Sequence, residues 1–451
     1  MKKLFSFFLF LFLALTACSI QFDEGTEVEN IPDLEIKTIN LTDALSTLSN
    51  FMDRNEKFML STKSGATREI SKVQVIYKNA TYSDISLTKS ISGDSTIISE
   101  PSCYVVNFAD SSGYAVLGAN TTMPLIVAVT EKGSIDADMI VSADSIDIYE
   151  IYKEKECGCE DEILLENFDW YNEAEDDFYV AKVEDTPIDD WIASNIFHTV
   201  VLTVGDGRMN GSPGGNQDYH VICEPLLQTE WGQGDWNTYG IYNKYCTKKC
   251  GTRRKHVYAG CGTTALATVL AYNEFPAIRQ NGVLLDYDAM KSKVNPEELD
   301  SLAKEYISLL YKDIFYRLDH VFISQYGTCT MPNKISNALS EYGYSEVRMY
   351  KKNYFSEEMF KATSAMLSKS KPVIISGVRR VWNGHTWIID GADYIEDKTA
   401  GTVSYMYHCD WGWDGSHNGY FATDCFDPFG NGRYSWHFRL ITYNVAKSHI
   451  F

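Results

Sequence analysis

Apolar residues recur at a helical spacing near the start of the chain, after a polar stretch that ends at about Pro32. Leu45, Leu48, Phe51 and Met52 fall on one face of a helix. Three runs with strand character follow, at Tyr104–Phe108, Tyr114–Ala119 and Pro124–Thr130. The pattern predicts a small α+β unit, its helix N-capped at Thr42.

The later part of the chain carries stronger helix signals and then a second group of strands. Asn295 followed by Pro296 and two glutamates predicts a helix start that continues with a leucine-rich face. Two further helices and three strands are predicted at Met331–Tyr342, Ser356–Leu367, Pro372–Val378, Thr386–Asp390 and Thr402–His408. Helices that precede strands in this way indicate an α+β fold here too.

Length and composition indicate a folded protein with more than one domain. The chain has 451 residues, of which 45% are hydrophobic and 22% charged. Its net charge of −21 opposes binding to a phosphate backbone, so nucleic acid is not expected as a partner.

The first residues predict export. Lys2 and Lys3 precede the apolar stretch Leu4–Leu15, which is too short for a stable membrane anchor. Small residues then lead directly to Cys18, as in the lipobox of bacterial lipoproteins. We therefore expect lipid on Cys18 and a bacterial cell-envelope location, on the outer membrane or surface; an ordinary cleaved signal peptide is the alternative.

Composition also predicts the domain boundaries. A segment rich in Gly, Asn and Ser, Gly205–Gln217, has the character of a flexible linker that proteases cut. We predict a signal peptide (1–17), a tether (18–32), an N-terminal domain (33–204), a linker (205–220) and a C-terminal domain (221–451).

The cysteines do not indicate a disulfide-based scaffold, because 11 of them are spread over a long chain. Cys246 and Cys250 are spaced for a local disulfide, and His256 would add a third ligand to a metal site there. No fourth ligand is evident nearby, so no metal is expected.

Two patterns suggest thiol chemistry. Cys261 lies between glycines at the start of a helix of small and apolar residues, where the helix dipole stabilises a thiolate. His385 follows Gly384 at the head of an apolar strand, where it can face a cleft. Each residue alone has an ordinary structural interpretation, as a buried cysteine or a hydrogen-bonding histidine.

A third pattern lies close behind, in the aromatic and glycine-rich segment Cys409–Phe421. These aromatic residues would shield an imidazole from water, and Asp410 could accept its second N–H. A packed turn is the alternative interpretation.

Together the three motifs resemble the streptopain family of secreted cysteine peptidases, over roughly Pro225–Phe451. The resemblance implies a papain-like two-lobed fold. The region around Tyr104–Phe108 and Gly113–Val129 is similar to the inhibitory propeptide of that family.

The resemblance assigns roles to particular residues. It makes Cys261 the nucleophile, His385 the base that pairs with it, and Gln233 the donor to the oxyanion. The turn containing Trp411 completes the catalytic site. The substrate groove would be lined by Gly384 and by the loop that contains Thr328 and Cys329.

One position departs from the family, which has asparagine where this chain has Asp410. A carboxylate against the imidazole would raise the pKa of His385, whereas a solvent-facing carboxylate would change little.

The resemblance therefore implies a lipid-anchored cysteine endopeptidase made as a zymogen, without a cofactor. Its partners would be protein or peptide substrates, its own propeptide, and the membrane through Cys18. The alternatives are a catalytically silent surface lipoprotein that binds or inhibits a partner, and an acyltransferase of the same fold.

Overall fold

The protein is described by a computed structural model over residues 38–55, 68–85, 100–120, 123–141, 217–250, 252–324, 327–379, 384–398, 402–423, 425–429 and 433–445. All of these lie in one compact unit, residues 37–451. The predicted signal peptide and tether, with Cys18, lie outside the described residues. Below, residues 38–141 are the N-terminal region and residues 217–445 the C-terminal region.

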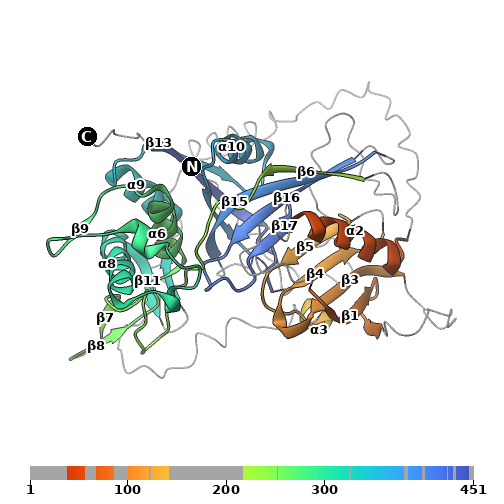
Figure 1. The fold of residues 1–451 in the computed structure, drawn as a ribbon, viewed down its shortest axis with the longest axis horizontal. Helices are drawn as coiled ribbons and strands as arrows, with labels where there is room; N and C mark the ends of the chain where they lie inside the picture. Colours follow the sequence, from red (N-terminus) through yellow and green to blue (C-terminus); the bar gives the residue numbers. More distant parts are fainter. Residues whose placement is uncertain are drawn as a thin grey trace, which may run out of the picture. The chain divides into compact units, whose positions relative to one another are not determined.

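The N-terminal region is a helix packed on antiparallel strands (Figure 1). Its elements are α2 (Leu41–Asn55), β1 (Ile70–Tyr77), β2 (Tyr82–Ile85), β3 (Pro101–Phe108), η1 (Ala109–Ser111), β4 (Tyr114–Gly118), β5 (Ile126–Thr130) and α3 (Ala137–Val141). The predicted helix and three strands are confirmed. The predicted cap at Thr42 is wrong, because Oδ1 of Asn40 accepts the N–H of Asp43 at 2.9 Å.

The C-terminal region contains helices and short hairpins before its main strands. The helical elements are α6 (Cys261–Asn273), α7 (Tyr287–Met290), η3 (Pro296–Glu298), α8 (Ser301–Arg317), α9 (Pro332–Glu341) and α10 (Glu357–Leu367). The hairpins pair β7 (Thr247–Cys250) with β8 (Arg253–His256), β9 (Arg279–Gln280) with β10 (Val283–Leu284), and β11 (His320–Ser324) with β12 (Gly327–Thr330).

Of two helix starts predicted from the sequence, one is confirmed and the other is wrong by several residues. Ser356 caps α10 as predicted, since its hydroxyl accepts the N–H of Met359. Asn295 caps only the 3₁₀ turn η3, and the long helix begins after Asp300. The Asp300 carboxylate accepts the N–H groups of Leu302 and Ala303, so it satisfies two donors that would otherwise be unpaired.

The remaining strands belong to the same antiparallel sheet as the N-terminal strands. They are β6 (Gln217–Cys223), β13 (Ser345–Lys352), β14 (Val373–Val378), β15 (Gly384–Asp397), β16 (Thr402–Asp410), β17 (Gly419–Ala422) and β18 (Trp436–Asn444). The order is β13-β18-β14-β15-β16-β17-β5-β4-β3-β1-β2, with β6 also paired to β15. The three predicted strands are confirmed, and β15 is longer than expected.

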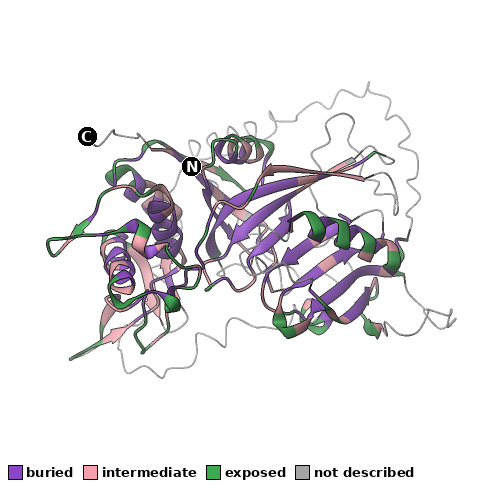
Figure 2. Cartoon of the chain, viewed as in Figure 1, coloured by how far each residue is buried: buried purple, intermediate pink, exposed green. Residues whose placement is uncertain are grey.

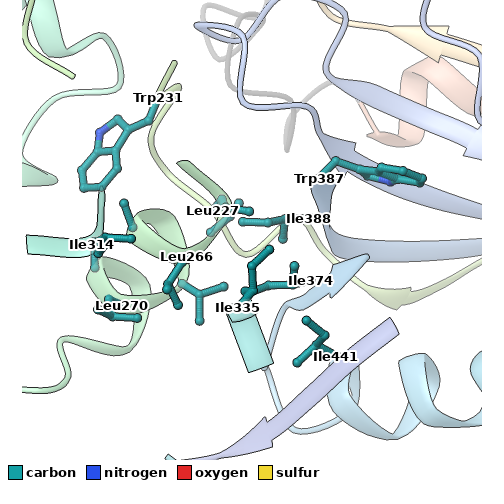
Figure 3. Packing of buried hydrophobic residues seen from close by; sticks show 14 of the residues in the cluster. Leu227, Trp231, Leu266, Leu270, Ile314, Ile335, Ile374, Trp387, Ile388 and Ile441 are labelled. Atoms are coloured by element: carbon teal, nitrogen blue, oxygen red, sulfur yellow. The ribbon is translucent and has the colours of Figure 1, made fainter. Parts of the chain in front are cut away.

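The largest hydrophobic core lies between α6 and this sheet. Figure 3 shows Leu266 and Leu270 of α6 in one group with Ile335, Ile374 and Ile388. Every residue of α6 from Gly262 to Ala271 is buried, which explains why its sequence is small and apolar throughout. Figure 2 shows that β15, β16 and β17 are buried along most of their length. Helices and sheet thus pack as two layers, which confirms the α+β fold class expected from the sequence.

The predicted domain boundaries stay predictions, and one of them overlaps regular structure. Residues 217–220, the last of the predicted linker, lie in β6 and pair with residues of β15. The rest of that linker, residues 205–216, lies outside the described residues. The described part of the C-terminal region therefore begins at Gln217.

Candidate active site

Cys261 is the first residue of α6, and its position depends on the glycine before it. Gly260 has φ +90°, and a Cβ there would lie 2.6 Å from the carbonyl oxygen of Thr328. The sulfur is half-buried, and burial raises the pKa of the Cys261 thiol. Hydrogen bonds from the main chain and side chain of Thr386 act in the opposite direction.

His385 is the second residue of β15 and is enclosed by aromatic rings. Its ring centroid lies 4.4 Å from that of Trp413 and 5.8 Å from that of Tyr434. Burial lowers the pKa of His385 to about 4, opposed by a hydrogen bond to Trp411, and the charge of Arg379 lowers it further. The buried imidazole is therefore neutral at physiological pH.

A main-chain carbonyl determines which nitrogen of His385 carries the proton. Nε2 lies 2.9 Å from the carbonyl oxygen of Trp411. Because that oxygen only accepts, Nε2 must donate, and in the neutral ring Nδ1 keeps the lone pair. Nδ1 is thus the nitrogen available as a base.

Cys261 contacts β15, the strand that contains His385, but no described hydrogen bond joins the two side chains. Thr386, which donates to the Cys261 sulfur, is the next residue after His385. Both shifts of pKa favour neutral groups, and the thiolate–imidazolium pair stays a prediction.

Gln233 is held beside the start of α6 by its main chain. Its carbonyl oxygen accepts the N–H of Ala259 at 2.9 Å. The carbonyl oxygen of the preceding Gly232 accepts hydrogen bonds from the hydroxyls of Thr264 and Tyr311, each at 3.0 Å. This segment lies against the first turn of α6, although β7 and β8 intervene in the sequence.

Asp410 differs from both expectations for it. The residue is 4% exposed, so it does not face solvent, and Oδ1 accepts the N–H of Gly412 at 2.9 Å. The N–H of His385 is accepted by the Trp411 carbonyl instead of by this carboxylate. Burial raises the pKa of Asp410 to about 7, against the effect of the hydrogen bond from Gly412. Trp411 itself is fully buried, with its ring stacked against that of Trp413.

The expected substrate-binding residues lie on two sides of the site. Thr328 packs on Gly260, and its hydroxyl donates to the carbonyl of Tyr258 at 2.6 Å. Burial raises the pKa of Cys329 to about 12, and the nearby charge of Cys261 contributes to the rise. Gly384 opens β15 directly before His385 and is exposed. The contacts of these residues with substrate stay predictions.

Sequence reasoning missed two residues of the site. The sequence indicates Thr386 only as the start of a strand, and Asn418 only as part of the aromatic turn. The side chain of Asn418 accepts the N–H of Trp411 at 3.0 Å. Their nearness to His385 and Trp411 in the sequence was the available signal, but neither partner could be identified without the turn conformation.

Potential metal ligands are grouped elsewhere in the described part of the chain. Asp218, His220 and Glu396 bring ligand atoms within 4.8 Å of one another between β6 and β15. All three are partly exposed, and Asp218 already pairs with Lys398. Cys246 is a free, buried thiol, so the local disulfide considered for it is not formed.

A cysteine at the start of a buried helix, with a histidine at the head of the adjoining strand, is the framework of papain-like thiol hydrolases. Residues 236–421 match the Peptidase C10 family, and this segment includes Cys261 and His385 but begins after Gln233. Streptopain of Streptococcus pyogenes is 27% identical over 208 residues, covering 40% of this chain and 48% of that protein. The family resemblance drawn from the three motifs is thereby confirmed for this segment.

The chain spans about half the length of the curated relatives it matches. Among solved structures, the prointerpain A fragment of Prevotella intermedia gives a TM-score of 0.46 at 19% identity, covering 76% of this chain and 95% of that one. Active interpain A of the same organism, a cysteine protease, gives 0.39 at 20% identity, covering 49% and 93%.

Proposed function

We propose that this chain is an exported cysteine endopeptidase made as a zymogen. The observation that carries the proposal is the junction of α6 and β15. There, the first residue of the helix is a cysteine whose sulfur accepts hydrogen bonds from Thr386, and the residue before Thr386 is a buried histidine. The match of residues 236–421 to the Peptidase C10 family supports it.

The residues of the site suit acyl transfer to sulfur. In the active form, Nδ1 of His385 takes the proton of the Cys261 thiol, and the sulfur attacks the scissile carbonyl carbon. The Trp411 carbonyl keeps the Nε2–H and holds the ring during this transfer. The imidazolium then protonates the leaving amine, and His385 next activates water to hydrolyse the thioester.

The oxyanion formed in both steps needs a hydrogen-bond donor. Gln233 directly follows Gly232, whose carbonyl is bonded by Thr264 and Tyr311 beside α6, and this supports Gln233 as that donor. A donor of this kind lowers the barrier by roughly 3 kcal/mol. The rings of Trp411 and Trp413 exclude water from the imidazole, which strengthens its interactions with charge.

The N-terminal region has the contacts expected of an inhibitory propeptide. Strand β5 pairs with β17, directly after the turn that holds Trp411. The hydroxyl of Tyr114 donates to the carbonyl of Pro428 at 2.5 Å. Since the site is electrically neutral in this intact form, we propose that release of the N-terminal region, by cutting within residues 205–216, lets the ion pair form.

Export and lipid attachment are part of the same proposal. They rest on the N-terminal sequence that ends at Cys18, which lies outside the described residues. In the part of the chain that the structure covers, no helix is long and apolar enough to span a bilayer. Replacement of Cys18 by serine should abolish incorporation of a radioactive fatty acid.

The nucleophile is tested by comparing the native chain with Cys261→Ala and with a control, Cys223→Ala. Cys223 is a partly exposed thiol on β6 that donates to the carbonyl of its neighbour Glu224. Native protein and Cys223→Ala should hydrolyse an unfolded protein and react with an electrophilic peptide probe, whereas Cys261→Ala should do neither. Full hydrolysis by Cys261→Ala would disprove the proposal.

The same samples separate the two rival functions. A silent binding protein would leave the native chain unreactive toward both the probe and the substrate. An acyltransferase would react with the probe and pass the acyl group to an added amine in preference to water.

A further inference from the structure

Two hydrogen bonds connect Asn418 to the imidazole of His385. Oδ1 of Asn418 accepts the N–H of Trp411 at 3.0 Å, and the carbonyl of Trp411 lies 2.9 Å from Nε2 of His385. Asn418 is 3% exposed, in the turn directly before β17. The residue therefore holds the main chain that orients the base.

A second contact determines which way the Asn418 amide points. The Asp410 carboxylate accepts a hydrogen bond from the Asn418 side chain. Only the NH₂ group of the amide can donate to a carboxylate, so the amide oxygen is directed to the N–H of Trp411. The second hydrogen bond of Asp410, from Gly412 N, holds the carboxylate in place.

We propose that Asn418 is a positioning residue for His385. Held by Asp410, it fixes the main chain at Trp411 so that the carbonyl keeps the Nε2–H and Nδ1 remains free as the base. The inference rests on the proposed peptidase function for its consequence in catalysis, but the tautomer it assigns is a property of the folded chain.

The main chain of Asn418 also contacts the N-terminal region. Its carbonyl oxygen accepts the N–H of Glu131 at 2.7 Å, immediately after β5. The turn that orients His385 is thus in direct contact with the segment whose release we expect to activate the enzyme. Charged groups around it are Asp390 and His408, which act on Asp410, and Arg379, which acts on His385.

The first test measures the tautomer of His385 in the intact chain, where activity plays no part. Imidazole ¹⁵N chemical shifts are recorded in the Cys261→Ala background, with and without Asn418→Ala. The parent should show only the Nε2–H tautomer, and Asn418→Ala should add the Nδ1–H form. An unchanged tautomer would overturn the proposal, whatever the outcome for peptidase activity.

The second test measures kinetics of the processed enzyme. Loss of alignment should lower kcat of Asn418→Ala by about 10- to 100-fold with little change in KM, and should shift the pH profile. Ser416→Ala is the matched control, because its hydroxyl bonds Nδ1 of His417 in the same turn at 2.7 Å. Equal kcat and equal profiles for Asn418→Ala and native enzyme would contradict the proposal.

A third variant keeps the proposal testable if Asn418→Ala does not fold. Asn418→Asp retains an acceptor for the Trp411 N–H but puts a second carboxylate beside Asp410. It should preserve the Nε2–H tautomer and move the acid limb of the pH profile. A profile that matches the native one would argue against any influence of Asn418 on His385.

Discussion

Asp410 shows how one buried side chain changes the properties of the site. The carboxyl group is buried at the end of β16, where the loss of hydration raises its pKa to about 7. Hydrogen bonds from Gly412 and Asn418 favour the ionised form but do not overcome the loss of hydration. Near neutral pH this residue therefore changes charge in the fold, whereas in the unfolded chain it is already ionised.

Asp410→Asn is accordingly expected to stabilise the protein at neutral pH. The pKa is higher in the folded state than in the unfolded state, so ionisation opposes folding increasingly as pH rises from about 4 through 7. Asparagine keeps the acceptor for Gly412, and the gain at pH 8 should be roughly 1–3 kcal/mol. Urea unfolding at pH 4 and pH 8 measures it; equal differences at the two pH values would contradict the explanation.

At the scale of elements, α6 and α8 together fix the segment that leads to Gln233. Tyr311 lies in α8 and Thr264 in the first turn of α6, and both hydroxyls donate to the same carbonyl of Gly232. All three residues are buried. Loss of either hydrogen bond would therefore loosen the main chain at Gly232, directly before Gln233, the expected oxyanion donor.

Tyr311→Phe should lower the free energy of unfolding by about 1 kcal/mol, because one of two buried hydrogen bonds to Gly232 is lost while the ring remains. It should also lower kcat more than it changes KM, since Gln233 follows Gly232. Tyr316→Phe is the control in the same helix, as its hydroxyl bonds the Tyr245 carbonyl at the surface. Identical effects of the two variants on kcat would exclude the proposed link to Gln233.

At the scale of the whole molecule, the N-terminal region is held to the C-terminal region by a shared sheet and by two ion pairs. In one pair the N-terminal region supplies the negative charge, and in the other it supplies the positive charge. The carboxylate of Glu131 lies 3.0 Å from Nε2 of His408, and Lys132 pairs with Glu230. On its other side, Nδ1 of His408 lies 2.6 Å from Asp390. Burial disfavours charge on His408, but the two carboxylates outweigh it and raise its pKa to about 10.

Stability of the intact chain should therefore fall as the solution becomes alkaline. His408 contributes fully below its unfolded pKa of about 6.5, and that contribution is lost as pH rises toward 10. Glu131→Gln should reduce this dependence by on the order of 1–3 kcal/mol between pH 6.5 and 10, as His408 then has one carboxylate fewer. The measurement is urea unfolding against pH.

Glu69→Gln serves as the control for this measurement, because Glu69 is exposed in the same region. It should leave the slope of stability against pH as it is in the native chain. A native chain whose stability does not change over this pH range would rule out the charged His408 described here.

Several features could be read from the sequence because they depend on neighbours in the chain. Periodic apolar residues located α2, β3, β4 and β5, and the glycines around Cys261 located the start of α6. Helix and strand periods result from local backbone geometry, which is why short segments reveal them. The motifs around Cys261 and His385 also indicated the family that residues 236–421 match.

Other features were decided only by the tertiary structure, because they depend on partners distant in the sequence. The pairing of β5 with β17, the charge on His408 and the contact of Asp410 with Asn418 each require strands or turns to meet in space. The sequence by itself thus determined the local elements and the residues that carry the chemistry. Tertiary packing decided their protonation and orientation, since burial and hydrogen-bond partners, rather than residue type, determine both.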